Sequence, residues 1–167
     1  MNEKDEKIFE AWVALIRSHQ MLTDAVENDL KQAGLPPLSW YDVLLEINRE
    51  PDCRLRLQDI GSRILLAKNN VTRLVDRLEK EKLVTRKKCK SDGRGVYAYI
   101  EPEGKALLKK MWPIYRQSVL THFKAGLSDK DIGNLCAILQ ILRSSAPSGT
   151  EKSELVHGTE RNIKNVN

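Results

Sequence analysis

The chain has few of the features that mark secreted, membrane-bound or metal-binding proteins. Its three cysteines, Cys53, Cys89 and Cys136, are odd in number and widely spaced, unlike a disulfide framework or a zinc ligand set. We therefore expect reduced thiols. No apolar run approaches the roughly 18 residues of a membrane-spanning helix, and residues 1–7 are too charged for a signal peptide. The sequence predicts a cytoplasmic protein that does not contact a membrane.

Arrangements typical of enzymes are also missing. The three histidines, His19, His122 and His157, lie too far apart in the sequence to indicate a metal site. An enzyme would need a nucleophile with a base and an orienting group, or a phosphate-binding loop, and neither pattern occurs. We therefore expect no catalytic activity, no cofactor and no metal. The 167 residues, 41% hydrophobic and 31% charged, are typical of about one globular domain.

The chain does have a concentration of positive charge. It carries 28 Lys and Arg against 23 Asp and Glu, a net charge of +5. Residues 52–94 hold thirteen of the basic and six of the acidic residues, a net +7, so the rest sums to −2. Clustered Lys and Arg displace counterions from phosphates, so this distribution favours a polyanionic partner. A basic run alone also fits a solvated surface, and the local structure must decide.

One part of this basic segment has the periodicity of an amphipathic helix. Between residues 68 and 80, an apolar stripe with i, i+3, i+4, i+7 spacing is formed by Val71, Leu74, Val75 and Leu78. The opposite side is polar: it carries Asn69, Arg73, Asp76 and Lys80, flanked by Asn70, Thr72 and Arg77. Such side chains read base edges and phosphates. We predict a DNA recognition helix whose contacts are made by Lys68, Asn69, Asn70, Thr72, Arg73 and Arg77.

A basic hairpin follows this helix. Residues 84–90 and 94–100 read as two short strands around Ser91-Asp92-Gly93, and an Asp-Gly pair is a hairpin signal. We expect the phosphate contacts of this wing to come from Lys87, Lys88 and Lys90. Arg94, at the tip, would enter the minor groove, and the alternative is a solvated loop arginine. Asp92 would brace the wing or an arginine, and the alternative is an ordinary turn aspartate.

Helices are predicted before the wing and after it. A long first helix covers about residues 5–32, and a second has Ser39 as its N-cap and stops before Pro51. Residues 57–64 form a short helix that makes a helix-turn-helix with the recognition helix. The sequence thus predicts a mainly α fold with a small β-wing, in which a winged helix-turn-helix is joined to a helical dimerisation region.

The last third of the chain adds two helices. Pro102 suits the first turn of one, and Pro113 inside it predicts a bend. Ser128 and Asp131 resemble a capping box at the start of the other. We assign residues 1–50 and 102–145 to the dimerisation region, 51–101 to the DNA-binding lobe, and the polar residues 146–167 to a disordered tail.

Some residues have both a functional and a structural interpretation. A ligand cleft between the dimer helices and the DNA-binding lobe is one interpretation of Trp12, His19, Trp40, Trp112 and Tyr115, and core packing is the other. Cys89 lies between Lys88 and Lys90, which would lower the pKa of its thiol and make it sensitive to oxidants. The alternative is a small residue of a β-strand.

Together these elements resemble the MarR family of winged-helix bacterial regulators over roughly residues 8–143. The similarity rests on residues 71–79, Leu83-Val84, the wing triplet Asp92-x-Arg94, Gly104, Leu127-Ser128 and the helical segment 40–44. The resemblance implies a homodimer in which the first and last two helices of each chain intertwine. It also implies sequence-specific binding to a pseudo-palindromic operator, usually as a repressor released by small aromatic ligands or by thiol oxidation.

The resemblance leads us to expect double-stranded DNA, a second copy of the chain and a small aromatic ligand as partners. The first helix lacks the cysteine of the peroxide-sensing branch, so that mechanism is not expected here. The alternative function is a winged helix that contacts protein or RNA without specific DNA binding. The polar side of the recognition helix argues against this alternative, because its side chains match base edges and phosphates.

Overall fold

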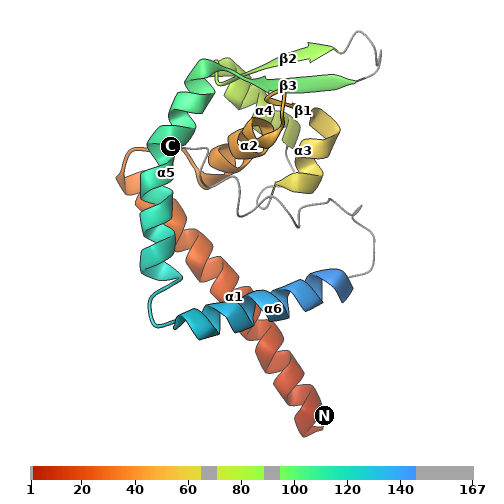
Figure 1. Cartoon of the computed structure of the whole chain (residues 1–167), viewed down its shortest axis with the longest axis vertical. Helices are drawn as coiled ribbons and strands as arrows, with labels where there is room; N and C mark the ends of the chain where they lie inside the picture. Colours follow the sequence, from red (N-terminus) through yellow and green to blue (C-terminus); the bar gives the residue numbers. More distant parts are fainter. Residues whose placement is uncertain (1, 65–70, 89–94, 146–167) are drawn as a thin grey trace.

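The computed structural model describes residues 2–64, 71–88 and 95–145 (Figure 1). The elements follow in the order α1 (Glu3–Gln32), α2 (Leu38–Arg49), β1 (Arg54–Arg56), α3 (Leu57–Arg63), α4 (Val71–Lys80), β2 (Val84–Lys88), β3 (Val96–Ile100), α5 (Pro102–His122) and α6 (Asp129–Ser145). The predicted fold class, mainly α with a small β-wing, is confirmed. The tail 146–167 lies outside the described residues.

Helix α1 begins and ends as local capping rules require. The Asn2 side chain accepts a hydrogen bond of 2.9 Å from the Asp5 backbone N–H, and acidic residues in the first turn match the positive end of the helix dipole. At the other end Gly34 has φ +66°, and the Leu35 N–H donates to the Leu30 carbonyl at 2.9 Å. This left-handed glycine is a common helix stop, because it lacks a Cβ.

Helix α2 begins differently from the prediction. Ser39 is not its N-cap, because the helix starts at Leu38 and the cap position is Pro37, which makes no side-chain cap. Both carboxylate oxygens of Glu27, on α1, accept from the Leu38 backbone N–H at 3.1 Å. A side chain from another helix therefore satisfies the free N–H, which local sequence rules cannot anticipate. The predicted end before Pro51 is confirmed.

The three strands form an antiparallel sheet in the order β1-β3-β2. The two wing strands were predicted, and the described parts are Val84–Lys88 and Val96–Ile100. The three-residue strand β1 was not predicted. Its Leu55 pairs with Ala98 of β3, which in turn pairs with Arg86 of β2. Leu55 and Ala98 are buried, so this face of the sheet covers the core.

The core lies between the sheet, α2, α3, α4 and the adjoining parts of α1 and α5. Its largest fully buried side chains include Leu30, Leu44, Ile47, Ile60, Leu78, Leu108 and Met111. Gly104 allows α5 to approach the sheet closely: a Cβ there would lie 2.3 Å from the Leu83 carbonyl oxygen and 2.8 Å from Ile100 Cγ1. No side chain fits at that distance, so the position requires glycine.

Helices α5 and α6 start as predicted. Pro102 lies in the first turn of α5, which continues through Pro113, and Figure 1 shows that the helix is not straight. The capping box of α6 is confirmed: the Asp131 N–H donates to Ser128 Oγ at 3.2 Å, and the Ser128 N–H donates to Asp131 Oδ2 at 3.0 Å. The hydrogen bonds from Ser128 lower the pKa of Asp131.

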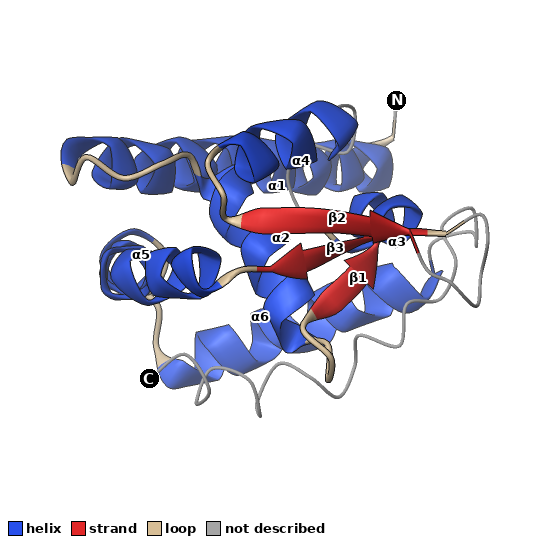
Figure 2. Cartoon of the chain, turned by 90° about the horizontal axis from the view of Figure 1, so that it is seen from above, coloured by secondary structure: helices blue, strands red, loops and turns tan. Residues whose placement is uncertain are grey.

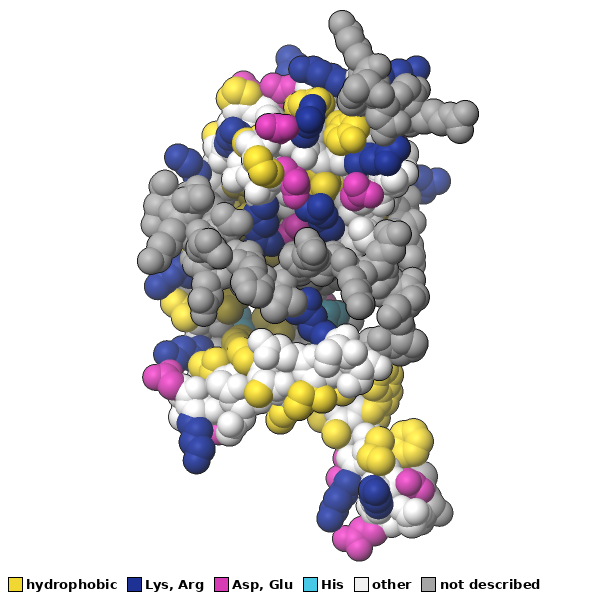
Figure 3. All heavy atoms as spheres, turned by 45° about the vertical axis from the view of Figure 1, so that its right-hand side comes forward, with side chains coloured by type: hydrophobic (Ala, Val, Ile, Leu, Met, Phe, Trp, Pro, Cys, Tyr) yellow, Lys and Arg dark blue, Asp and Glu magenta, His cyan; other side chains and the backbone are white. Residues whose placement is uncertain are grey.

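Much apolar surface remains uncovered in the single chain. Helix α6 buries no residue, and residues 6–20 of α1 are all exposed. Figure 3 shows hydrophobic side chains along α6 and the N-terminal part of α1. The larger of these exposed side chains are Ile8, Phe9, Trp12, Val13, Leu15, Ile16, Ile138, Leu139, Ile141 and Leu142. These side chains are of the kinds that fill a hydrophobic core, but none of the described elements packs over them.

In the part of the chain that the structure describes, none of the helices is both long enough and apolar enough to cross a membrane. The cytoplasmic location remains a prediction.

Candidate nucleic-acid interface

Helix α4 has one buried and one exposed side, as its periodicity predicts. Leu74, Val75 and Leu78 are buried in the core. Thr72, Arg73 and Arg77 are exposed on the opposite side, and within the described residues neither arginine forms an ion pair. The helix is thus held by its apolar stripe while its guanidinium groups remain available to a ligand.

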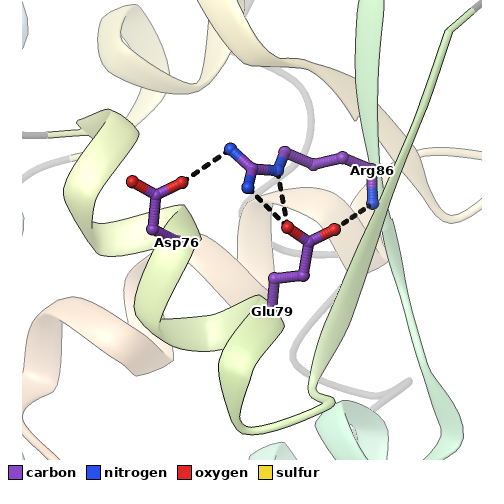
Figure 4. Close-up of polar contacts among 3 residues, drawn as sticks. All are labelled: Asp76, Glu79 and Arg86. Carbon is purple, nitrogen blue, oxygen red and sulfur yellow. Dashed lines mark hydrogen bonds and ion pairs between the residues drawn. The ribbon is translucent and has the colours of Figure 1, made fainter.

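A network of charged side chains joins α4 to strand β2 (Figure 4). Arg86 Nη1 donates to Asp76 Oδ1 at 2.6 Å, and Arg86 Nε and Nη2 donate to Glu79 Oε2 at 2.8 and 2.5 Å. The Arg86 backbone N–H donates to Glu79 Oε1 at 2.9 Å. These contacts fix the angle between the helix and the wing strand, since they use both the side chain and the backbone of one residue.

The same network shifts the pKa values of Glu79 and Arg86. The hydrogen bonds from the Arg86 side chain and backbone lower the pKa of Glu79. In the other direction, the hydrogen bond to Glu79 raises the pKa of Arg86. Both groups therefore stay charged at neutral pH.

This network was not predicted from the sequence. Asp76 was placed on the polar side of the recognition helix and Arg86 only within the basic segment, whereas the structure pairs the two. A signal was present in the sequence. Asp76 and Glu79 are spaced i, i+3 on one helix face, and Arg86 shares its strand face with the buried Val84. Strand alternation thus separates Arg86 from its exposed neighbours.

Lys87 and Lys88 are both exposed, and strand alternation turns them to opposite faces of β2. The Lys87 ammonium lies 5.1 Å from the ring centre of Tyr99 on β3. The other predicted contacts, Lys68, Asn69, Asn70, Lys90, Arg94 and the wing-bracing Asp92, lie outside the described residues, as does Cys89. Their roles remain predictions.

The five predicted ligand residues are in two different environments. Trp40, Trp112 and Tyr115 are half-buried and pack against the core. The ring of Tyr115 lies 6.2 Å from that of Trp112 and 4.9 Å from that of Tyr41, and burial raises the pKa of Tyr115. Trp12, 61% exposed, and His19 lie on the open part of α1. A single chain therefore packs only Trp40, Trp112 and Tyr115 against the core, and among them Trp112 and Tyr115 are in ring contact.

Buried charge lies beside these aromatic residues. Asp42 and Glu46 on α2 are buried, and Glu46 forms an ion pair with Arg49. Burial raises the pKa of Glu46, although the nearby Arg49 acts against this. Within the described residues no group of His, Cys, Asp or Glu could hold a metal ion. The polar groups thus lie along α2 rather than in a metal-binding cluster.

Comparison with known proteins identifies the family. Residues 33–95 match the model of the MarR family. The chain is also 30% identical to the uncharacterized HTH-type transcriptional regulator YkoM of Bacillus subtilis over 138 residues, which cover 83% of this chain and 87% of YkoM. The chain belongs to the MarR family. A second relative from Bacillus subtilis, the HTH-type transcriptional regulator MhqR, is 32% identical over 115 residues, 68% of this chain and 74% of MhqR.

Solved MarR structures share the fold. The regulator Sco3205 of Streptomyces coelicolor, whose crystal structure is a complex with DNA, superposes with a TM-score of 0.77 at 24% identity, covering 90% of this chain and 94% of that one. BpsR of Bordetella bronchiseptica, whose DNA binding is regulated by 6-hydroxynicotinic acid, gives a TM-score of 0.69 at 22% identity over 80% and 92%. These structures show that the fold is a winged helix. The family and the two Bacillus subtilis relatives make this MarR protein a DNA-binding transcriptional regulator, and those relatives are regulators rather than enzymes.

Proposed function

We propose that this MarR protein is a repressor that binds a pseudo-palindromic operator as a homodimer. The observation that carries the proposal is the orientation of α4, whose apolar stripe is buried while Arg73 and Arg77 are exposed. Arginine forms bidentate hydrogen bonds with guanine edges and with phosphates. A helix fixed against the core and the Arg86 network presents these groups at a constant angle, which major-groove reading requires.

The uncovered apolar surface supports the homodimer. Monomeric proteins rarely expose a contiguous apolar patch as long as that of α1 and α6. A second copy of the chain carries the same apolar patch, so pairing the two copies covers the patch on each. Two recognition helices related by a twofold axis then read two half-sites about one DNA turn apart, which explains a pseudo-palindromic operator. We place the dimerisation region at residues 1–50 and 102–145, and the DNA-binding lobe at 51–101.

Ligand response is the second part of the proposal. We infer that a small aromatic ligand binds beside Trp40, Trp112 and Tyr115, because all three pack against the core from α2 and α5 and the rings of Trp112 and Tyr115 are in contact. Trp12 and His19 take part only if the partner subunit brings them there, since they are exposed in the single chain. The regulation of BpsR by 6-hydroxynicotinic acid supports this class of ligand. Addition of a ligand of this class should quench the tryptophan fluorescence of this protein and release it from DNA.

The DNA-binding part is tested with the duplex upstream of the protein's own gene. Arg73→Ala and Arg77→Ala should each weaken binding by about 1 to 3 kcal/mol in fluorescence anisotropy, because each removes a base or phosphate contact. Lys109→Ala, which removes one positive charge from an exposed position on α5, is the matched control. Wild-type affinity in both arginine variants would exclude α4 as the reading helix.

The sign of regulation needs a transcription assay. Adding the protein to a template with its operator should reduce transcription, and the Arg73→Ala variant should reduce it less. Increased transcription would identify an activator. If the wild type binds no duplex from its own upstream region and binds RNA or protein instead, the alternative function of a winged-helix interaction module would replace this one.

A further inference from the structure

The outer face of the three-stranded sheet carries a surface that the recognition helix and the wing tip do not explain. Along β3, Ala98 and Ile100 are buried, whereas Tyr97 and Tyr99, which alternate with them, are only half-buried. Side chains alternate between the two faces of a strand, so both tyrosines lie on the face away from the core. Figure 2 looks onto this face, and among the described elements none lies in front of it.

The strands on both sides of β3 add cations to the tyrosines. By register, Tyr97 pairs with Arg56 of β1 and Lys87 of β2, and Tyr99 pairs with Arg54 and Thr85. Directly paired residues point to the same face of a sheet. We call this surface the outer sheet face; it consists of Arg54, Arg56, Thr85, Lys87, Tyr97 and Tyr99. Three of these residues, Arg54, Arg56 and Lys87, are cations, so the outer sheet face complements an anionic partner.

Two of the cations are held over the tyrosine rings. The Arg54 guanidinium carbon lies 5.5 Å from the ring centre of Tyr97 and 6.0 Å from that of Tyr99, and its Nη1 donates to the Tyr99 hydroxyl at 3.2 Å. The Lys87 ammonium lies 5.1 Å from the Tyr99 ring centre. These cation–π contacts hold the positive charges at the surface and reduce the entropy cost of ordering them when a partner binds.

This arrangement favours phosphates over unpaired bases. Single-stranded nucleic acid binds to sheets whose aromatic rings are open for base stacking, but Arg54 and Lys87 already occupy the ring faces. A stacked guanidinium still directs its N–H groups outward in its own plane, where they match a phosphate. Arg54 Nη2 also lies 3.1 Å from the carboxylate of Asp52. This exposed ion pair contributes little stability, and a phosphate bound to Arg54 would replace it.

We propose that the outer sheet face binds the phosphate backbone of duplex DNA that flanks the operator beyond the wing. The inference rests on the proposed function, because the wing must first place the sheet on DNA. Strands β2 and β3 are the two strands of the wing, so the outer sheet face is continuous with the proposed DNA interface. The protein then contacts more DNA than its recognition helices and wings reach, and the added contacts do not depend on sequence.

The test compares two duplexes bound by the full-length protein. The short duplex ends at the outermost bases that the wings protect, and the long one adds about one helical turn of unrelated sequence on each side. Wild type should bind the long duplex more tightly and with a steeper salt dependence. In the Arg54→Gln/Arg56→Gln variant the ratio of the two affinities should fall to about one. The slope of log affinity against log salt on the long duplex should fall by about 0.9 for each phosphate that the variant no longer neutralises.

Charge-matched variants keep the result specific. Lys105→Gln/Lys109→Gln removes the same two charges from exposed positions on α5 and should retain the wild-type ratio. Arg54→Lys/Arg56→Lys should restore part of the ratio, because it keeps the charge. Should the glutamine pair fail to fold in a thermal melt, Arg56→Gln alone serves for the comparison.

Three outcomes would overturn the inference. The first is an unchanged ratio in the folded glutamine variant, and the second is a wild type that gains nothing from the flanks although it binds the short duplex. The third is a variant that loses affinity only for single-stranded DNA, which would make unpaired bases the occupant. A wild type that binds neither duplex overturns the proposed function and this inference together.

Discussion

The DNA-binding lobe and the outer helices use apolar residues in opposite ways. In the lobe, Ile60, Val75, Leu78 and Val84 are fully buried within one chain. In α6 no residue is buried, although Ile132, Leu135, Leu139 and Leu142 repeat along it at helical spacing. Helix α1 shows both behaviours, because Val26 and Leu30 are buried near its end while its first half is exposed. Amphipathic periodicity thus predicts which side of a helix becomes buried, but not whether the same chain buries it.

The difference has an energetic meaning. Full burial of a Leu or Ile side chain contributes about 1.5 to 3 kcal/mol. The lobe gains this contribution from its own elements, whereas the exposed side chains of α6 and α1 gain it only from another surface. The lobe should therefore depend mainly on its internal packing, and the outer helices on association.

The largest expected effect comes from a charge on the apolar stripe of α6. Leu139→Glu should abolish dimerisation and operator binding, because it places a carboxylate in the proposed interface without touching a DNA contact. Gln140→Glu adds the same charge to the next, exposed position and should leave both properties intact. Sedimentation velocity at micromolar concentration measures the first property and anisotropy the second. A Leu139→Glu dimer that binds its operator would contradict the assignment of α6 to the interface.

A pair of glycine substitutions compares the two regions directly. Gly104→Ala should destabilise the protein by about 1 to 3 kcal/mol, because its Cβ would lie 2.3 Å from a backbone oxygen that cannot move away. Gly133→Ala, on α6, meets nothing within 4 Å in the single chain and should stabilise the helix by up to about 1 kcal/mol. Urea denaturation gives both values.

The second of these variants also locates the partner. If Gly133→Ala weakens the dimer instead of stabilising it, the partner's backbone approaches α6 closely at that position. If Gly104→Ala is neutral, the close contact between α5 and the Leu83 carbonyl is not maintained in solution.

The smallest expected effect concerns the charged network between α4 and β2. Its hydrogen bonds lower the pKa of Glu79 below the ordinary value of 4.5, so the native state binds fewer protons than the unfolded state. This stabilisation is present above pH 4.5 and is lost as the pH falls through the lowered pKa. Because Glu79 is about one-third exposed, the effect should stay below about 1 kcal/mol.

The measurement compares wild type with Glu79→Gln in urea denaturation across this range. Wild type should be more stable at neutral pH, and the difference should shrink as the solution is made more acidic than pH 4.5. Glu81→Gln, in the exposed turn after α4, is the charge-matched control. A difference between wild type and Glu79→Gln that is independent of pH would mean that the network contributes through packing rather than through charge.

Local patterns predicted most of the elements correctly. The apolar stripe of α4, the capping box at Ser128 and the first-turn Pro102 each depend on residues a few positions apart, and all three are present. The wrong and missing predictions involve distant partners. The free N–H at the start of α2 is satisfied by Glu27 of α1, and β1 exists because its three residues pair with a strand more than forty positions later. No local rule contains either partner.

The sequence by itself determined the helices, the basic segment and the polar side of α4, because helical periodicity and charge are properties of neighbouring residues. Only the tertiary structure decided which charges remain available. Arg86 is neutralised by Asp76 and Glu79, while Arg73 and Arg77 stay exposed, although all of them belong to the same basic segment. It also placed Arg54 on the tyrosines of β3, on a face that could not be assigned before the pairing of β1 was known. The physical reason is the same in each case: a charge acts through its surroundings, and the fold supplies these from distant parts of the chain.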